Sequence, residues 1–387
     1  MVPVFPRFSD PGWNTNTVIQ NRPQADDHIT EDLPRGVPLL RGQYVVESHL
    51  IGGGFGMTYL ARDSLERRVV IKECFPSALC RRVGREVQPR ARELQAGYQA
   101  VLGNFIKEAR RLARLDHPNI VHVHQVFEEN NTAYMVMDFV DGLDLVTIRE
   151  QEPSRLTRAV LERALRDTLG ALAYVHDLDI LHRDISLDNL LLDDHGRLTL
   201  IDFGAAREGQ CRKTRPLSAV LSVKDGYSPH EFYLKDMPQM PASDLYSVAA
   251  TFYHLITGSP PPDSQKRLAA LASDCADPYQ PLALGPWGLD HNMLVSIDRA
   301  LSVPQRDRIQ SVAEWLDLLD SDAVLPVAAK PEESGQLPTW LVKEMDPALY
   351  DAIASLVEDT NRHLAPAHPD RALRPLHPSA PGGAATR

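Results

Sequence analysis

The hydrophobic pattern of the chain changes its period near Gly142. Before this residue, short apolar stretches bounded by turn residues predict strands, which we place at residues 44–50, 57–61, 68–72, 121–127 and 133–139. Apolar side chains between Leu102 and Leu112 recur at helical spacing and predict one amphipathic helix among these strands. After Gly142, helical spacing predicts long helices at 160–175 and 244–257. Strands followed by helices indicate an α+β fold with two lobes.

The composition of the two ends differs from that of the middle. Residues 1–40 are rich in Pro, Asn, Asp and Thr without sustained periodicity, and we predict a flexible extension there. The folded domain is predicted to span residues 41–320, with an N-lobe at 41–140 and a C-lobe at 141–320. Residues 321–387 are predicted to form a tail rich in Pro and Ala, in which residues 347–361 favour one helix.

Charge excludes one broad class of function. The 387-residue chain carries 41 basic and 52 acidic residues, for a net charge of −11. This balance argues against nucleic-acid binding, which needs a basic face. Two local arginine patches lie near acidic residues, and we interpret them as solvated faces. They consist of Arg81, Arg82 and Arg85, and of Arg110, Arg111 and Arg114.

Cysteine usage and hydropathy indicate the cellular compartment in which we expect the protein. The four cysteines have neither zinc-ligand spacing nor the density of a disulfide scaffold, so they fit a reducing environment. The N-terminus lacks the apolar run of a signal peptide, and no stretch reaches the ~18 apolar residues of a membrane span. We expect a cytoplasmic protein without membrane insertion.

The strongest chemical signal lies between residues 182 and 204. His182-Arg183-Asp184 is followed by Asn189, and then by Asp202-Phe203-Gly204. Phosphoryl transfer needs a phosphate cradle, a cation, metal ligands and an oriented acceptor. In order and spacing these motifs resemble the signature set of the protein kinase family, and the resemblance extends over the predicted domain.

The resemblance implies a protein-kinase-like fold and a role for each polar residue. The N-lobe would be a small antiparallel sheet with one main helix, and the C-lobe would be larger and mostly helical. Asp184 would accept or orient the proton of the acceptor hydroxyl, while Asn189 and Asp202 would hold two magnesium ions. Lys72, which ends a strand of β-branched residues, would pair with ATP phosphates, with Glu108 as its partner.

The nucleotide loop and the hinge are the other implied ATP contacts. The loop consists of Ile51, Gly52, Gly53, Gly54, Phe55 and Gly56, with Ile51 where the family has its first glycine. A β-branched residue disfavours the left-handed backbone that glycine allows. Met137 would be the gatekeeper of the adenine pocket, with backbone groups of Asp138, Phe139 and Val140 facing adenine.

One departure from the family pattern concerns charge beside the γ-phosphate. Serine/threonine kinases usually carry a lysine two residues after the catalytic aspartate, where this chain has Ser186. Lys224 falls where the family usually has the threonine that faces this lysine. We hypothesise that the two residues have exchanged places, so that Lys224 supplies the cation and Ser186 the hydroxyl. An ordinary exposed loop lysine is the alternative.

Further motifs resemble the structural elements of protein kinases. Glu231 would end the activation segment and pair with Arg308, and Asp244 would hold the catalytic loop. The run Lys72-Glu73-Cys74-Phe75-Pro76 resembles that of a subgroup of bacterial kinases. Candidate phosphorylation sites in the activation segment are Thr214, Ser218 and Ser222.

Together these features predict a bacterial, eukaryotic-like serine/threonine protein kinase. It would use ATP and Mg²⁺ and would phosphorylate proteins, including itself. A pseudokinase that binds nucleotide as an interaction module is the main alternative, because of Ile51 and Ser186; a small-molecule kinase is a second one. The sequence identifies neither the protein substrate nor the oligomeric state.

Overall fold

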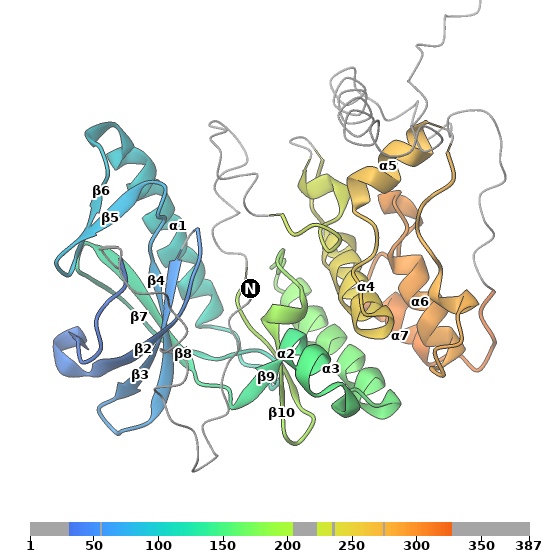
Figure 1. The fold of residues 1–387 in the computed structure, drawn as a ribbon, viewed down its shortest axis with the longest axis horizontal. Helices are drawn as coiled ribbons and strands as arrows, with labels where there is room; N and C mark the ends of the chain where they lie inside the picture. The colour runs from blue at the N-terminus through green and yellow to red at the C-terminus, as the bar shows by residue number, and fades with distance from the viewer. Residues whose placement is uncertain (1–30, 55, 204–222, 234–236, 274, 327–387) are drawn as a thin grey trace, which may run out of the picture. The chain divides into compact units, whose positions relative to one another are not determined.

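The computed structural model describes residues 31–54, 56–203, 223–233, 237–273 and 275–326. The chain divides into two compact units, residues 1–222 and 223–387 (Figure 1). Phe55, the three candidate phosphorylation sites and the helix predicted at 347–361 lie outside the described residues. The predicted domain boundaries stay predictions.

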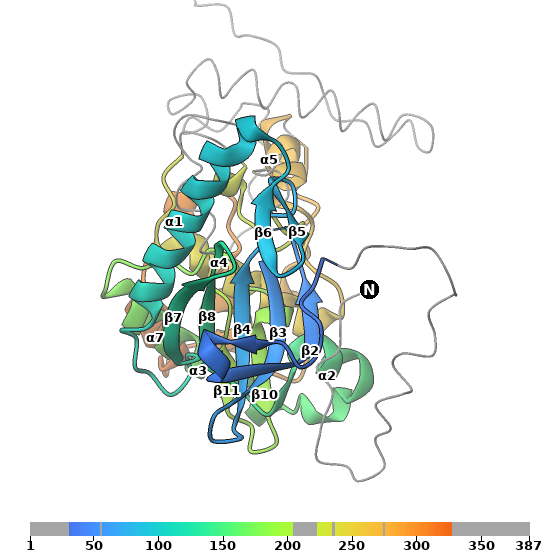
Figure 2. The same ribbon diagram turned by 90° about the vertical axis from the view of Figure 1, so that its left-hand side faces the viewer.

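The first unit contains a six-stranded antiparallel sheet, which Figure 2 shows. All five predicted strands are present, and a short additional strand, β1, pairs with the first of them. In spatial order the strands are β1 (Pro38–Leu39), β2 (Tyr44–Gly52), β3 (Gly56–Asp63), β4 (Arg68–Cys74), β8 (Thr132–Asp138) and β7 (Val123–Glu129).

Helix α1 (Gln95–Leu112) packs along β7 and β8 of this sheet (Figure 2). Its buried side chains recur at helical spacing, as predicted: Tyr98, Leu102, Phe105, Ala109 and Leu112. Leu112 lines a small cavity with Met135 and Met137 of β8, so these two methionines lie on the helix side of the sheet.

A second core covers the opposite face of the sheet. Leu33, Val37 and Leu39 are buried against side chains of the strands that include Tyr59 and Ile71. Side chains alternate between the two faces along β4, so Val69 and Ile71 face this core whereas Lys72 faces the side of the sheet that α1 covers. Residues 33–39 are therefore part of the packed unit, upstream of the predicted domain start at residue 41.

A hairpin between β4 and α1 was not predicted. It consists of β5 (Cys80–Val83) and β6 (Glu86–Pro89). The interpretation of its arginines as a solvated face is wrong for Arg82, whose side chain is 4% exposed and forms an ion pair with the fully buried Glu73. A basic side chain can be buried where an acidic partner is buried beside it.

The remainder of the first unit combines a three-stranded sheet with helices. The sheet has the order β11 (Leu198–Leu200), β10 (Leu190–Asp193), β9 (Gly142–Asp144). Asp144 and Thr157 cap the N-termini of helices α2 (Leu145–Gln151) and α3 (Arg158–His176), and the side chain of each accepts a backbone N–H group of the first turn. Helix α3 packs against β11.

The described part of the second unit is helical. Its helices are α4 (Pro241–Thr257), α5 (Ser264–Ala272), α6 (His291–Ala300) and α7 (Val312–Leu319). Helix α4 ends at Gly258 in the left-handed conformation, with φ of 86°. Helix α6 contacts α4 and α7, and the buried indole of Trp315 donates a hydrogen bond of 2.9 Å to Ser296.

Single turns of 3₁₀ helix connect several of these elements. They are η1 (Leu40–Gly42), η2 (Arg92–Leu94), η3 (Pro153–Arg155), η4 (Leu187–Asn189), η7 (His230–Phe232), η8 (Leu282–Leu284) and η9 (Gln305–Asp307). Within the described ranges, no helix is both long enough and apolar enough to cross a membrane.

The second unit holds the predicted ion pair of Glu231 and Arg308. Both side chains are fully buried, and the guanidinium donates to the two carboxylate oxygens at 2.6 and 3.1 Å, so this prediction is confirmed. Burial alone would raise the pKa of Glu231, but the charges of Arg308 and His230 and the hydrogen bonds to the carboxylate together outweigh it, so the pKa lies below the ordinary value. Burial lowers the pKa of the neighbouring His230 to about 4.

The buried His230 gives the stability of the protein a defined pH dependence. An unfolded chain takes up a proton at this histidine near pH 6.5, whereas the folded chain does so near pH 4. As pH falls between these values, the free energy of unfolding should decrease by about 1.4 kcal/mol per pH unit from this residue. Urea unfolding of wild type and His230→Gln between pH 7.5 and 4.5 measures the difference. The exposed His195→Gln serves as control, and equal slopes for His230→Gln and wild type would contradict the prediction.

Candidate active site

The ammonium of Lys72 and the carboxylate of Asp202 form an ion pair in the first unit. Lys72 lies in β4 on the helix side of the sheet, and Asp202 follows strand β11. Their side chains are 20% and 41% exposed, so both charges remain accessible to a ligand. The structure thus brings together two residues that are 130 positions apart in the chain. Lys72 was predicted to pair with ATP phosphates and Asp202 to hold magnesium.

The loop of Asp184 lies beside Asp202. The Asn189 side-chain amide donates a hydrogen bond of 2.7 Å to the Asp184 carbonyl, and the Ile201 N–H donates one of 3.0 Å to the Asn189 carbonyl. The rings of His182 and Phe203 lie 4.4 Å apart between their centroids. These contacts join the two motifs into one constellation.

Two residues of this constellation have an unusual backbone. Arg183 and Asp202 have φ angles of 66° and 58°, in the left-handed region that side chains other than glycine rarely adopt. Such residues persist where the surrounding contacts determine them, and they cluster at functional sites. The backbone geometry agrees with a functional role for this region.

Ser186 contacts an acidic neighbour. Its hydroxyl donates a hydrogen bond of 2.5 Å to the Asp188 carboxylate. Lys224 belongs to the second unit, where its backbone N–H donates to the Ser228 hydroxyl at 3.0 Å. The exchange of roles between Ser186 and Lys224 stays a prediction.

The glycine loop connects β2 and β3. Ile51 continues β2 opposite Thr58, so the position of the family's first glycine has an extended backbone that suits a β-branched residue. The Gly53 N–H donates to the Gly56 carbonyl at 2.9 Å. A side chain at Gly56 would place its Cβ 2.7 Å from the Glu73 carbonyl oxygen, so this position requires glycine. Gly52 ends β2, and Gly54 has open space around it.

The segment predicted as the hinge follows β8. Met137 is buried near Val121 and Phe203, as a residue at the back of a nucleotide cleft would be. The exposed Asp138 carboxylate pairs with His124 at 2.7 Å, and the Val140 carbonyl accepts the Gly142 N–H at 3.1 Å. The adenine contacts stay predictions.

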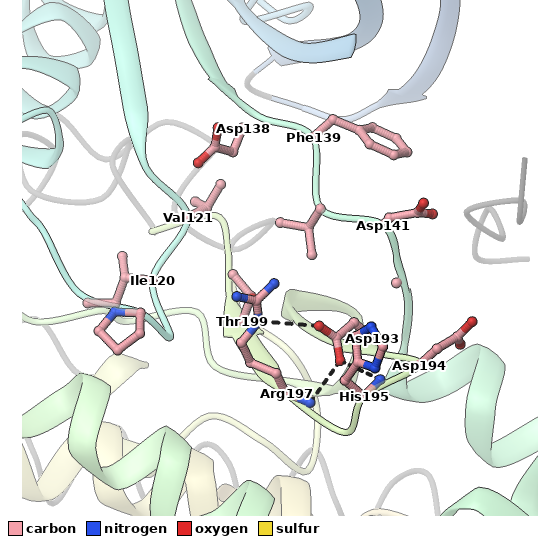
Figure 3. A pocket seen from close by; sticks show the side chains of 13 residues that line it. Ile120, Val121, Asp138, Phe139, Asp141, Asp193, Asp194, His195, Arg197 and Thr199 are labelled. Carbon is pink, nitrogen blue, oxygen red and sulfur yellow. Dashed lines mark hydrogen bonds and ion pairs between the residues drawn. The ribbon is translucent and has the colours of Figure 1, made fainter. Parts of the chain in front are cut away.

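A pocket of about 440 Å³ lies against this segment (Figure 3). It is lined by residues 138–142, by Pro118, Ile120 and Val121, and by the turn from β10 to β11. In the turn, Asp193 accepts backbone hydrogen bonds of 2.9 Å from His195 and Arg197. Neither Lys72 nor Asp202 lines this pocket.

Comparison with known proteins identifies the family. The family model described as "Protein kinase domain" matches residues 44–282. This chain belongs to the protein kinase family.

The similar proteins are bacterial serine/threonine-protein kinases. PknA of Nostoc sp. is 30% identical over 301 residues, covering 74% of this kinase and 48% of the relative. PksC of Streptomyces coelicolor is 31% identical over 296 residues, covering 73% and 49%. The kinase thus spans about half the length of these curated relatives.

A solved structure is similar in fold. The structure titled "PpkA-294 apo form" is 36% identical, with a TM-score of 0.66, and the match covers 75% of this chain and all of that one. The predicted α+β kinase fold, with a small antiparallel sheet followed by helices, is confirmed, as is the predicted resemblance to bacterial serine/threonine protein kinases.

The structure shows a partner of Lys72 that was not predicted. The structure pairs the Lys72 ammonium with Asp202, whereas Glu108 lies half-buried on α1. A contact between Lys72 and Glu108 stays a prediction, as does the contact of the buried Asp244 with the catalytic loop.

Sequence reasoning missed the role of Glu73, although a signal was available. Strand residues alternate between faces, so Glu73 shares its face with the buried Val69 and Ile71. A carboxylate in such a series must have buried partners. Searching for them would have pointed to Arg82 and to the tyrosines of neighbouring strands.

The close approach of the loop to β4 predicts a difference between two glycines. Gly56→Ala should lower the free energy of unfolding by about 1–3 kcal/mol, because the added methyl group meets a strand carbonyl. Gly53→Ala, with nothing within 4 Å of an added Cβ, should change it by less than about 0.5 kcal/mol. Urea unfolding measures both, and equal effects would refute the packing argument.

Proposed function

We propose that this kinase transfers the γ-phosphate of ATP to serine and threonine hydroxyls of proteins, including its own chain. The observation that carries the proposal is the Lys72–Asp202 ion pair beside the loop of Asp184 and Asn189. The names of the two curated relatives described above, both serine/threonine-protein kinases, support the acceptor type. ATP is available in the cytoplasm, so the proposal includes a cytoplasmic location.

The residues fit magnesium bound together with phosphates. The Asn189 side-chain nitrogen donates to the Asp184 carbonyl, so the side-chain oxygen of Asn189 can bind a cation. Asp202 offers a partly exposed carboxylate. Magnesium is usually held by one or two such oxygens together with substrate phosphates. Bound there, the ions would neutralise charge on the β- and γ-phosphates.

The remaining roles belong to groups of the chain itself. The Lys72 ammonium would bind phosphate oxygens, and the Asp184 carboxylate would accept or orient the proton of the acceptor hydroxyl. The glycine loop, closed by the Gly53–Gly56 hydrogen bond, would cover the phosphates with backbone N–H groups.

Transfer of radiolabelled γ-phosphate from ATP with magnesium tests the proposal. Asp184→Asn and Lys72→Met should each lower the rate at least about 100-fold, because each removes a group that acts on the reacting phosphate or hydroxyl. Asp322→Asn, at an exposed position, should retain the wild-type rate. A wild type that binds ATP without transferring label would favour the pseudokinase instead.

The exchange hypothesis has its own test. Lys224→Ala should lower the transfer rate about 100-fold, because it removes a cation that stabilises charge near the γ-phosphate. The double variant Ser186→Lys/Lys224→Thr restores the usual family arrangement and should recover activity. Lys266→Ala serves as the exposed control. Full activity of a folded Lys224→Ala protein would refute the exchange.

A further inference from the structure

Strand β4 carries two adjacent charged residues that point to opposite faces of the sheet. Lys72 faces Asp202, while Glu73 is fully buried in the core that residues 33–39 cover. Because the two residues are neighbours, whatever fixes the position of Glu73 along the strand also fixes that of Lys72.

The Glu73 carboxylate connects three adjacent strands. It accepts hydrogen bonds of 2.9 Å from Tyr59 of β3 and 2.9 Å from Tyr134 of β8, on either side of β4. Tyr134 is also the residue directly opposite Glu73 in the β4–β8 pairing. A slip of one residue would turn Glu73 towards Lys72's present face and leave both hydroxyls without this acceptor.

Arg82 completes the carboxylate's environment and extends it to the N-terminal segment, residues 31–39. Its guanidinium donates to Glu73 at 2.5 Å, to the Glu31 carbonyl at 2.6 Å and to the Arg85 carbonyl at 3.1 Å. The same segment also reaches the cluster through the Leu33 N–H, which donates to the Tyr59 hydroxyl at 3.1 Å.

We propose that Glu73 and Arg82 are positioning residues for Lys72, and that through them the N-terminal segment determines how this lysine meets ATP. The inference rests on the proposed kinase activity. A purely structural role would make the pair important for folding only, and a folded protein without it would use ATP like the wild type. The two possibilities differ in ATP kinetics, not in stability.

A double variant separates the two roles. Removing one partner leaves a buried, unpaired charge and should lower the urea midpoint strongly, whereas Glu73→Gln/Arg82→Met removes both charges together and should restore most of it. Glu73→Gln keeps an acceptor for the tyrosines. Glu47→Gln/Arg62→Met, a half-exposed pair on β2 and β3, is the matched control.

The decisive readout is the use of ATP by the folded double variant. We expect kcat/KM for ATP to fall roughly 10- to 100-fold, because the lysine is no longer held in register. KM for a generic protein acceptor and all parameters of the control pair should stay unchanged. Wild-type ATP kinetics in the folded double variant would overturn the proposal.

A second variant and a binding measurement cover the remaining outcomes. Tyr134→Phe removes one hydrogen bond to Glu73 and keeps the ion pair, so kcat/KM for ATP should fall by less than in the double variant. If the double variant does not fold, wild-type ATP kinetics in Tyr134→Phe would overturn the proposal. The affinity for ATP, measured by calorimetry, distinguishes failure of the positioning role from failure of the proposed kinase activity. If wild type binds ATP without transfer, equal affinity in the double variant overturns the positioning role, and weaker affinity supports it. A wild type without ATP binding overturns both.

Discussion

A carboxylate buried without partners costs several kcal/mol, and Glu73 is fully buried. Its hydrogen bonds from Tyr59, Tyr134 and Arg82 make this position tolerable, and each donor comes from a different element of the first unit. The sheet can therefore adopt this register only when β3, β8 and the β5–β6 hairpin are all in place. Because Lys72 is the next residue, the constraint that orders the interior of the sheet also orders the face that holds the candidate active site.

Among the residues that the structure describes, each unit has a glutamate–arginine pair in which both side chains are almost completely buried: Glu73 with Arg82, and Glu231 with Arg308. Such pairs add little net stability compared with apolar residues of similar size, yet losing one partner is costly. In each pair, the two residues come from different segments of the unit. Their physical effect is to select one arrangement of those segments over others.

Local periodicity was enough to predict the long strands and helices, since alternation in β4 and helical spacing in α1 and α3 are properties of the sequence itself. The candidate site was identified because the spacing from Asp184 to Asn189 and Asp202 resembles the kinase signature. The hairpin was missed because its arginines suggest a solvent-exposed face until Glu73 is known to lie beside Arg82. The pairing of Lys72 with Asp202 depends on how distant segments pack, which periodicity does not contain.

The position of the N-terminal segment has a practical consequence for protein production. Sequence similarity to the family begins at residue 44, but Leu33, Val37 and Leu39 fill the core below β2 to β4. A recombinant fragment cut at residue 44 would expose this apolar surface and would remove β1, leaving β2 as an open sheet edge. Both features promote self-association. Aggregation of such a fragment would reflect where it was cut, and would say nothing about the solubility of the longer chain.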